Sequence, residues 1–255
     1  MVRPVDSIKA IGNGLKHKKN GVWESTGGPG DAVAALPGIV HRLKATDLAL
    51  ADGGAVAAWG DLVQANAARR PVFMAEGGID GGPVVRFANY SFLTGPFARP
   101  NYIDWFVMAV LKRNATGVRQ GVALLGPMAQ GTWATFEASG NISVRQSGNH
   151  IAWTGDLDDQ QPHVFGWGGW HTSPEDLSGG ASRTYTDDPN EDANLGGLGG
   201  NGYDAFWDTM ILGSRGADAD NLVADVAEII ICNEFPTLEQ RTAAFAALAA
   251  EYSIS

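Results

Sequence analysis

The stretch LVADVAEIIIC, residues Leu222–Cys232, decides the fold class of this chain. It is an almost unbroken apolar run, and a run of this length that is rich in valine and isoleucine predicts a strand covered on both faces. Almost all of the sequence before it also predicts β-structure. A β-rich chain that closes on such a strand belongs to a small set of folds.

The segment after this strand predicts one helix over residues 237–252. Thr237 and Gln240 have the spacing of a capping box. Apolar residues then recur on one side of a 3.6-residue repeat. They are Leu238, Phe245, Leu248 and Tyr252. We expect this helix to pack back on the body and to cover the outer face of a neighbouring strand.

The composition predicts one compact body with a lead-in segment. The chain has 255 residues, 44% of them hydrophobic and 18% charged, and it contains 34 glycines. This length is sufficient for the core of a single β-sandwich, and the glycines predict many tight turns. Residues 1–37 contain turn signals such as GGPG without a sustained hydrophobic period, so they predict an irregular arm. Residues 38–255 are expected to form the sandwich domain with its helix.

The charge and the single cysteine exclude several classes of protein. The formal net charge is −10, and an acidic surface argues against a nucleic-acid partner or an anionic membrane, since both require a basic patch. Cys232 is the only cysteine, so we expect a buried thiol and no CxxC zinc site. No apolar stretch reaches the ~18 residues that span a bilayer, and no secretory signal follows Met1. The expectation is a protein made in a cytoplasm.

Short apolar runs separated by Gly, Asn, Asp or Pro recur from Ile39 onward. This pattern is typical of an antiparallel sandwich or barrel. The expected hairpins join Trp133–Ala138 to Asn141–Gln146 and His163–Trp170 to Ser182–Thr186. In the run Trp105–Lys112 we expect the odd-numbered side chains to face the opposite sheet and the even-numbered ones to meet a second apolar layer.

Several motifs occur in one order along residues 39–255. They are LKATDL at Leu43–Leu48, DGG at Asp52–Gly54, VAAWGD at Val56–Asp61, RP at Arg70–Pro71, GPVVRF at Gly82–Phe87, GSR at Gly213–Arg215, AEII at Ala227–Ile230 and the helix Leu238–Tyr252. In this order the motifs resemble the laminin-G-like, concanavalin A-like lectin/glucanase sandwich, in the version found in phage virion proteins and bacterial surface proteins.

The resemblance implies an all-β fold, an antiparallel β-sandwich of the concanavalin A-like jelly-roll type with a C-terminal α-helix. The chain departs from the pattern in three places. Val63–Asn66 replaces a Ser-Gly-Asn-Gly turn, Arg42 stands where a tryptophan is common, and the loop Asp187–Asp204 is longer than expected. These departures leave the fold in place, but the family's ligand site is not carried over to this chain.

The sequence predicts a protein that is not an enzyme. Glycoside hydrolysis requires two carboxylates that flank the scissile bond, and the glucanase branch supplies them in a Glu-x-Asp-x-x-Glu motif that this chain lacks. Glu175-Asp176 and Glu191-Asp192 are adjacent pairs, whose side chains point apart on an extended chain. No GxSxG elbow, HExxH helix or Walker loop occurs.

Trp167 and Trp170 are the candidate sugar-binding residues. They lie in a glycine-rich run between His163 and His171, and an exposed indole face can stack on a sugar ring. The alternative is that both belong to the core, as most tryptophans of a sandwich do. The two histidines are interpreted as strand and loop residues rather than as ligands.

Calcium is the candidate cofactor. Asp218, Asp220 and Asn221 supply hard oxygen ligands at short spacing. A second acidic group of this kind consists of Asp187, Asp188, Asn190, Glu191 and Asp192. Neither group has EF-hand spacing, so the alternative is a solvated acidic loop that binds no metal.

Two functions fit these observations. The favoured one is a non-enzymatic structural virion protein of a bacteriophage or phage-like particle, as a capsid decoration or a tail or fibre component. It would attach to other virion proteins through residues 1–37, form a homo-oligomer and bind a host-surface glycan. Release by host lysis would reconcile an extracellular recognition fold with the missing export signal. The alternative is a carbohydrate-binding module or surface adhesin of a bacterium.

Overall fold

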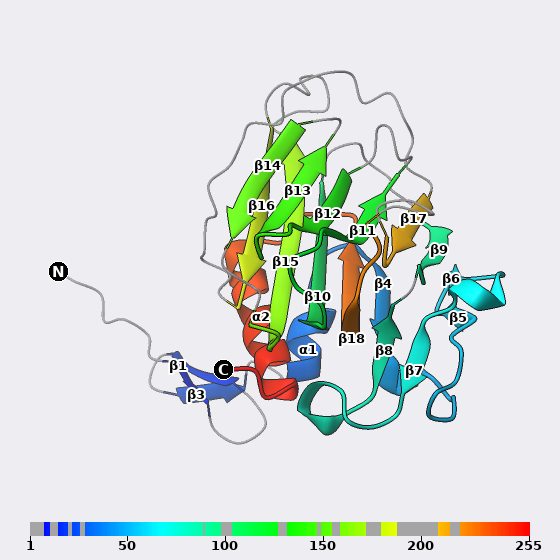
Figure 1. Cartoon of the computed structure of the whole chain (residues 1–255). Helices are drawn as coiled ribbons and strands as arrows, with labels where there is room; N and C mark the ends of the chain where they lie inside the picture. Colours follow the sequence, from blue (N-terminus) through cyan, green and yellow to red (C-terminus); the bar gives the residue numbers. More distant parts are fainter. Residues whose placement is uncertain are drawn as a thin grey trace.

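Two antiparallel sheets stack face to face as a sandwich, and α-helices cover the outer face of one of them (Figure 1). The computed structural model describes residues 8–10, 15–19, 22–25, 29–88, 90–97, 104–126, 132–146, 149–154, 159–171, 180–187, 209–214 and 220–255. The predicted all-β sandwich with a C-terminal helix is confirmed.

The first sheet has seven strands within the described residues. In spatial order it contains β16 (Gly180–Thr186), β15 (Pro162–His171), β10 (Trp105–Arg113), β18 (Ala224–Cys232), β8 (Val84–Phe87) and β7 (Val72–Met74). The strand β4 (Ile39–Lys44) also pairs with β18, in line with β8 along the same edge. The predicted hairpin between the strands that became β15 and β16 is confirmed.

The second sheet has eight strands within the same residues. Their order is β14 (Asn149–Thr154), β13 (Ile142–Gln146), β12 (Thr132–Phe136), β11 (Gln120–Leu125), β17 (Thr209–Leu212), β9 (Leu93–Pro96), β6 (Leu62–Val63) and β5 (Ala58–Trp59). The pairing of β12 with β13 confirms the other predicted hairpin. Short 3-10 helices occur at η1 (Ala45–Asp47), η2 (Ala67–Arg69) and η3 (Ile79–Gly81).

The strand β10 is central and buried on both faces, as its sequence predicts. Trp105 and Val107 belong to the core between the sheets, whereas Phe106 and Met108 belong to a second core on the helix side. The alternation of side chains along an extended strand therefore supplies both cores at once. This makes the seven-stranded sheet the middle layer of the molecule.

The strand β18 changes faces at a β-bulge. Its pairing with β10 skips Ala227, which is the extra residue. Val226 and Ile229 consequently both face the core between the sheets, although two residues lie between them, a spacing that puts side chains on opposite faces of a regular strand. Cys232 lies in the helix-side core as a buried free thiol, in agreement with its prediction.

The helix α2 (Leu238–Glu251) begins with the predicted capping box. The backbone N–H of Gln240 donates to Thr237 Oγ1, and the backbone N–H of Thr237 donates to Gln240 Oε1. Phe245 and Leu248 are buried against the sheet. The expectation for Leu238 is wrong, because this side chain is 50% exposed in the first turn of the helix.

Arg241 takes the buried place in that first turn. Its guanidinium lies 4.9 Å from the ring centre of Tyr185 and 5.1 Å from that of Phe235. It also donates a 2.6 Å hydrogen bond to the carbonyl of Pro236. A stacked arginine is compatible with an apolar environment because its plane covers aromatic faces, so a charged residue can replace the expected leucine.

The N-terminal segment contains more structure than an irregular arm. The strands β1 (Ile8–Ala10), β2 (Leu15–Lys19) and β3 (Val22–Ser25) form a sheet of their own. The short helix α1 (Pro29–Ala34) packs beside α2 (Figure 1). Val33 and Leu36 are buried in the helix-side core, so the sandwich body begins before residue 38. No helix in the described part of the chain has the length and apolarity needed to cross a membrane.

Candidate functional site

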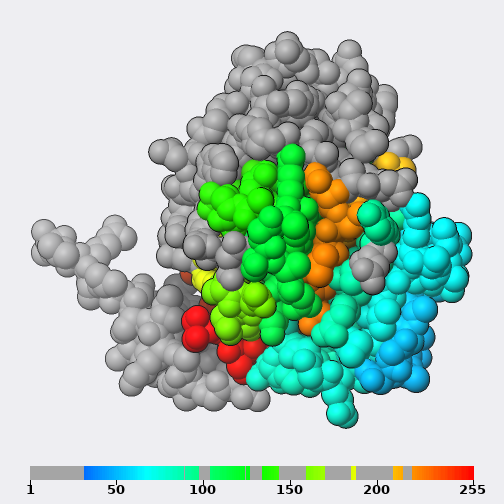
Figure 2. All heavy atoms as spheres, in the orientation of Figure 1, coloured from blue at the N-terminus to red at the C-terminus, as the bar shows by residue number. Residues whose placement is uncertain are grey.

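The antiparallel strands bring distant segments together at one end of the sandwich. There β10 finishes at Arg113, opposite the first residue of β18, and β12 finishes opposite Gln120, the first residue of β11. The two sheets are joined at this end, because Gln120 Oε1 accepts a 2.9 Å hydrogen bond from the backbone N–H of Val223. Figure 2 shows the green segments around β10 directly beside the orange segment that contains β18.

At the same end of the sandwich β15 begins and β16 ends. We call this end of the sandwich the polar rim. Ionisable side chains of the polar rim include Arg113, Arg119, Glu137, Asp159, His163, Asp187 and Asp220.

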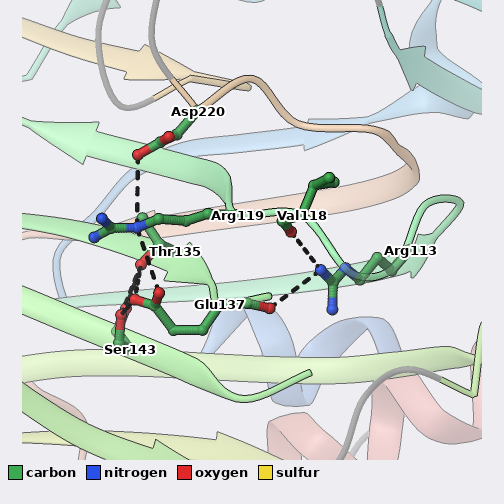
Figure 3. Close-up of polar contacts among 7 residues, drawn as sticks. All are labelled: Arg113, Val118, Arg119, Thr135, Glu137, Ser143 and Asp220. Atoms are coloured by element: carbon green, nitrogen blue, oxygen red, sulfur yellow. Dashed lines mark hydrogen bonds and ion pairs between the residues drawn. The ribbon is translucent and has the colours of Figure 1, made fainter. Parts of the chain in front are cut away.

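Arg119 lies between two carboxylates at the centre of the polar rim (Figure 3). Its Nε is 3.4 Å from Glu137 Oε2 and 3.6 Å from Asp220 Oδ2. The three residues come from the loop before β11, from the end of β12 and from the loop before β18. All three side chains are partly exposed, although Arg119 Nε and Asp220 Oδ2 themselves are buried.

The β12–β13 hairpin holds Glu137 in place. Thr135 and Ser143 are a buried cross-strand pair whose hydroxyls lie 2.7 Å apart. Both hydroxyls donate to Glu137 Oε1. Arg113 secures the same residue from the first sheet by donating a 3.2 Å hydrogen bond to its carbonyl, and a 2.7 Å bond to the carbonyl of Val118 (Figure 3). The carboxylate is therefore oriented before any ligand arrives.

Backbone hydrogen bonds hold residues 220–222, which precede β18. The carbonyl of Asp220 accepts a hydrogen bond from the backbone N–H of Gly121, and the backbone N–H of Leu222 donates to the carbonyl of Gly213. Asp220 itself has a positive φ of 50°. The side-chain oxygen of Asn221 is buried and has no hydrogen-bond partner among the described residues. It is an acceptor that a ligand could satisfy.

His163 is clamped by two aspartates at the edge of the polar rim. Its Nδ1 is 2.6 Å from Asp187 Oδ2, and its Nε2 is 3.0 Å from Asp159 Oδ1. The other oxygen of Asp187 accepts a hydrogen bond from the backbone N–H of Val164. Burial works to lower the pKa of His163, but the bonds to Asp187 and Asp159 outweigh it and the pKa is raised.

Sequence reasoning interpreted His163 only as a strand residue, and the structure shows why. The one local signal is Asp159, four residues earlier, while Asp187 comes from the far end of the next strand. The two carboxylates sit on opposite edges of the imidazole ring, so they do not converge on one point. In the described ranges, no group of three His, Cys, Asp or Glu residues could hold a metal ion.

The structure places the predicted sugar-binding tryptophans on β15. Trp167 is 2% exposed and belongs to the core between the sheets. A sugar ring requires an exposed indole face, so this burial argues against the stacking role of Trp167. Trp170 lies near the end of the same strand, and its side chain is outside the described residues.

Only some of the predicted calcium ligands lie within the described residues. Asp220 faces the guanidinium of Arg119, and Asn221 follows it on the polar rim. Asp218 lies outside the described residues. In the second acidic group Asp187 binds His163, and the other members, Asp188, Asn190, Glu191 and Asp192, are also outside them. Calcium binding stays a prediction.

Comparison with known proteins supports the fold alone. No family model and no curated protein matches this sequence. The chain is similar to Trypanosoma rangeli sialidase in complex with a difluorinated KDN, with a TM-score of 0.53 and 10% identity over 96% of this chain and 45% of that chain. It is also similar to the botulinum neurotoxin serotype D binding domain, with a TM-score of 0.55 and 8% identity over 85% of this chain and 53% of that chain.

The chain thus spans about half the length of these solved structures. At such low identity the likeness shows a shared fold and says nothing of the activity of this chain. The β-sandwich implied by the sequence resemblance is confirmed. The phage and bacterial-surface part of that resemblance stays a prediction.

Proposed function

We propose that this chain is a carbohydrate-recognition sandwich that binds a glycan at the polar rim without cleaving it. The observation that carries the proposal is the fixed row formed by Glu137, Arg119 and Asp220, with the acceptor of Asn221 beside it. Sugar hydroxyls both donate and accept hydrogen bonds, so adjacent hydroxyls match neighbouring carboxylate and guanidinium groups. Binding sites of this type use a few well-placed polar groups on a rigid frame.

The charges of the polar rim support binding rather than hydrolysis. A glycosidase requires one carboxyl that stays protonated so that it can act as an acid. In the polar rim the guanidinium of Arg119 lies between Glu137 and Asp220, in the place that a scissile bond would have to occupy. Burial works to raise the pKa of Asp159, but the backbone N–H of Gln161 and the ring of His163 outweigh it and lower the pKa.

A glycan array with the wild-type protein and three matched variants tests the proposal. Wild type is expected to bind at least one class of glycan. Glu137→Gln and Arg119→Gln are expected to weaken binding at least about ten-fold, because a lost charge-assisted hydrogen bond is worth about 1.5–3 kcal/mol. Glu239→Gln is the control, since Glu239 is exposed on α2. Absence of binding, or binding that Arg119→Gln leaves intact, would overturn the proposal.

The proposed absence of glycan cleavage is tested by a separate measurement. The glycans that bind are incubated with the wild-type protein, and new reducing ends are measured over time. We expect none above the level of buffer. Turnover that Glu137→Gln abolishes would contradict a purely binding role.

Repeating the array with calcium and with a chelator tests the predicted cofactor, whose loss should reduce binding if Asp218, Asp220 and Asn221 hold the ion.

We further propose that the recognition sandwich is a structural component of a phage particle and is attached by its N-terminal segment. The support is the order of sequence motifs along residues 39–255. Because Val33 and Leu36 belong to the core, the truncation that tests attachment removes residues 1–28 and spares α1. The truncated chain should fold but fail to incorporate into particles. Normal incorporation would favour the alternative, a bacterial carbohydrate-binding module or adhesin.

A further inference from the structure

An exposed aromatic residue with an unfavourable backbone conformation stands at the same end of the sandwich. Tyr90 lies in the turn between β8 and β9, is 59% exposed and has a φ of 67°. It is the only aromatic with positive φ among the described residues. Left-handed backbone costs free energy for a bulky residue, and such conformations gather at functional sites. A glycine would fit this position without strain.

Two hydrogen bonds join Ala88 and Ser91, on either side of Tyr90. The backbone N–H of Ala88 donates to Ser91 Oγ, and the backbone N–H of Ser91 donates back to the carbonyl of Ala88, both at 2.9 Å. Ser91 and Phe92 are buried. Tyr90 is thus an exposed residue directly before a buried segment.

The same turn adjoins the polar rim. Gly213 packs so closely on it that an added Cβ would collide with Phe87 and lie 3.2 Å from the carbonyl of Ser91. Gly213 in turn accepts a hydrogen bond from Leu222, two residues after Asp220. Val118, next to Arg119, is 51% exposed. Exposed apolar side chains therefore occur on the loops that flank the polar groups.

We infer that Tyr90 is the aromatic platform on which the apolar face of a neutral pyranose ring stacks. This inference rests on the proposed function. A pyranose offers C–H groups on one face and hydroxyls at its edge, so one ring of a glycan can stack on the tyrosine while hydroxyls of the same glycan contact the neighbouring polar rim. Acidic sugars are disfavoured, because the two carboxylates of the row repel them and Arg119 is already paired.

Three substitutions of Tyr90 separate stacking from a structural role. The probes are methyl β-galactoside, methyl β-glucoside and N-acetylglucosamine, followed by saturation-transfer NMR and titration. Tyr90→Phe should keep affinity within about two-fold, because the ring is retained. Tyr90→Ala and Tyr90→Gly should each lower it at least about ten-fold. Tyr90→Gly should also raise the thermal midpoint, because it relieves the backbone strain.

The outcomes distinguish this inference from the function on which it rests. The control is Leu238→Ala, which removes an equally exposed apolar side chain from α2 and should change nothing. If Arg119→Gln weakens binding while Tyr90→Gly binds as wild type does, the platform is wrong and the proposed function stands. If wild type binds none of the probes and no glycan on the array, both are overturned. Preference for an acidic sugar over the neutral probes would also overturn the inference.

Discussion

Glu228 is a fully buried carboxylate within the apolar strand β18. Its oxygens lie 2.8 Å from Arg42 Nε, 3.4 Å from Lys44 Nζ and 2.9 Å from the hydroxyl of Tyr252, just after α2. Burial, and then the charge of Glu228, raise the pKa of Tyr252, so the phenol stays protonated and donates. These contacts join β4, β18 and the C-terminal helix at one point.

Removing the charge of Glu228 should destabilise the fold. Glu228→Gln leaves Arg42 and Lys44 without their carboxylate, and we expect the free energy of unfolding to fall by about 2–3 kcal/mol. This is less than the ~3–5 kcal/mol typical of a fully buried pair, because both cations reach solvent. Urea unfolding measures it, with the exposed Glu234→Gln as control at within about 0.5 kcal/mol of wild type. Equal effects of the two substitutions would contradict this account of Glu228.

The clamp on His163 should make stability depend on pH. The pKa of His163 is raised in the folded protein. The contribution of the clamp to folding stability is therefore fully present below the unfolded pKa of about 6.5 and is lost as pH rises through the folded pKa. The lowered pKa of Asp159 acts in the opposite sense, with stabilisation lost as pH falls below about 4. The difference in urea midpoint between wild type and His163→Gln should therefore shrink from pH 6 to pH 9. A difference that is constant over this range would contradict the clamp.

At the scale of single elements, the bulge at Ala227 decides which side of β18 faces which core. In a regular strand that kept Ala227, Val226 would turn toward the helices, and Asp225, now bound to Arg86 by two hydrogen bonds, would point into the core between the sheets. Deleting Ala227 removes the extra residue and leaves both side chains on their present faces, so we expect that variant to unfold cooperatively in calorimetry. Deleting Ile230 from the regular part of the strand should abolish cooperative unfolding, because it exchanges the faces of the residues before it. Loss of cooperative unfolding in the Ala227 deletion, or its retention in the Ile230 deletion, would contradict this account of the bulge.

The strands and hairpins could be predicted because their signals are local. The alternation in β10, the turn between β12 and β13 and the capping box at Thr237 each lie within a short stretch of sequence. The burial of Trp167 was harder to predict, although the sequence contains a signal for it. Gly166 and Gly168 lie on the other face of β15, where an added Cβ would crowd Phe245 or Phe235. Glycines alternating with aromatics indicate that both faces of that strand are covered.

The polar rim could not be predicted, because its residues meet only through the topology. Arg119, Glu137 and Asp220 lie on three separate loops, and the carboxylate of Asp220 finds its cation about a hundred positions away in sequence. The exposure and φ of Tyr90 are likewise properties of the folded turn. Sequence reasoning therefore selected acidic loop residues for a metal, whereas the structure pairs the described ones with Arg119 and His163.

At the scale of the whole molecule, one central sheet contributes to two cores, and the groups of the proposed binding site lie at the polar-rim end of the sandwich. The seven-stranded sheet is covered by the second sheet on one face and by α1 and α2 on the other. The loops of the polar rim are hydrogen-bonded to both sheets, so a rigid body holds the ligand-binding groups in place. The face of the central sheet that is turned away from the second sheet packs against α1 and α2.

An amide NMR titration with a glycan selected on the array tests the central claim most directly. If the polar rim is the recognition surface, the shifted amides should cluster at Val118–Gln120, Glu137–Ser143, Asp220–Val223 and the turn at Tyr90, and the glycan should be recovered uncut. Shifts confined to α2 and the outer face of the central sheet, or release of cleaved sugar during the titration, would contradict the account.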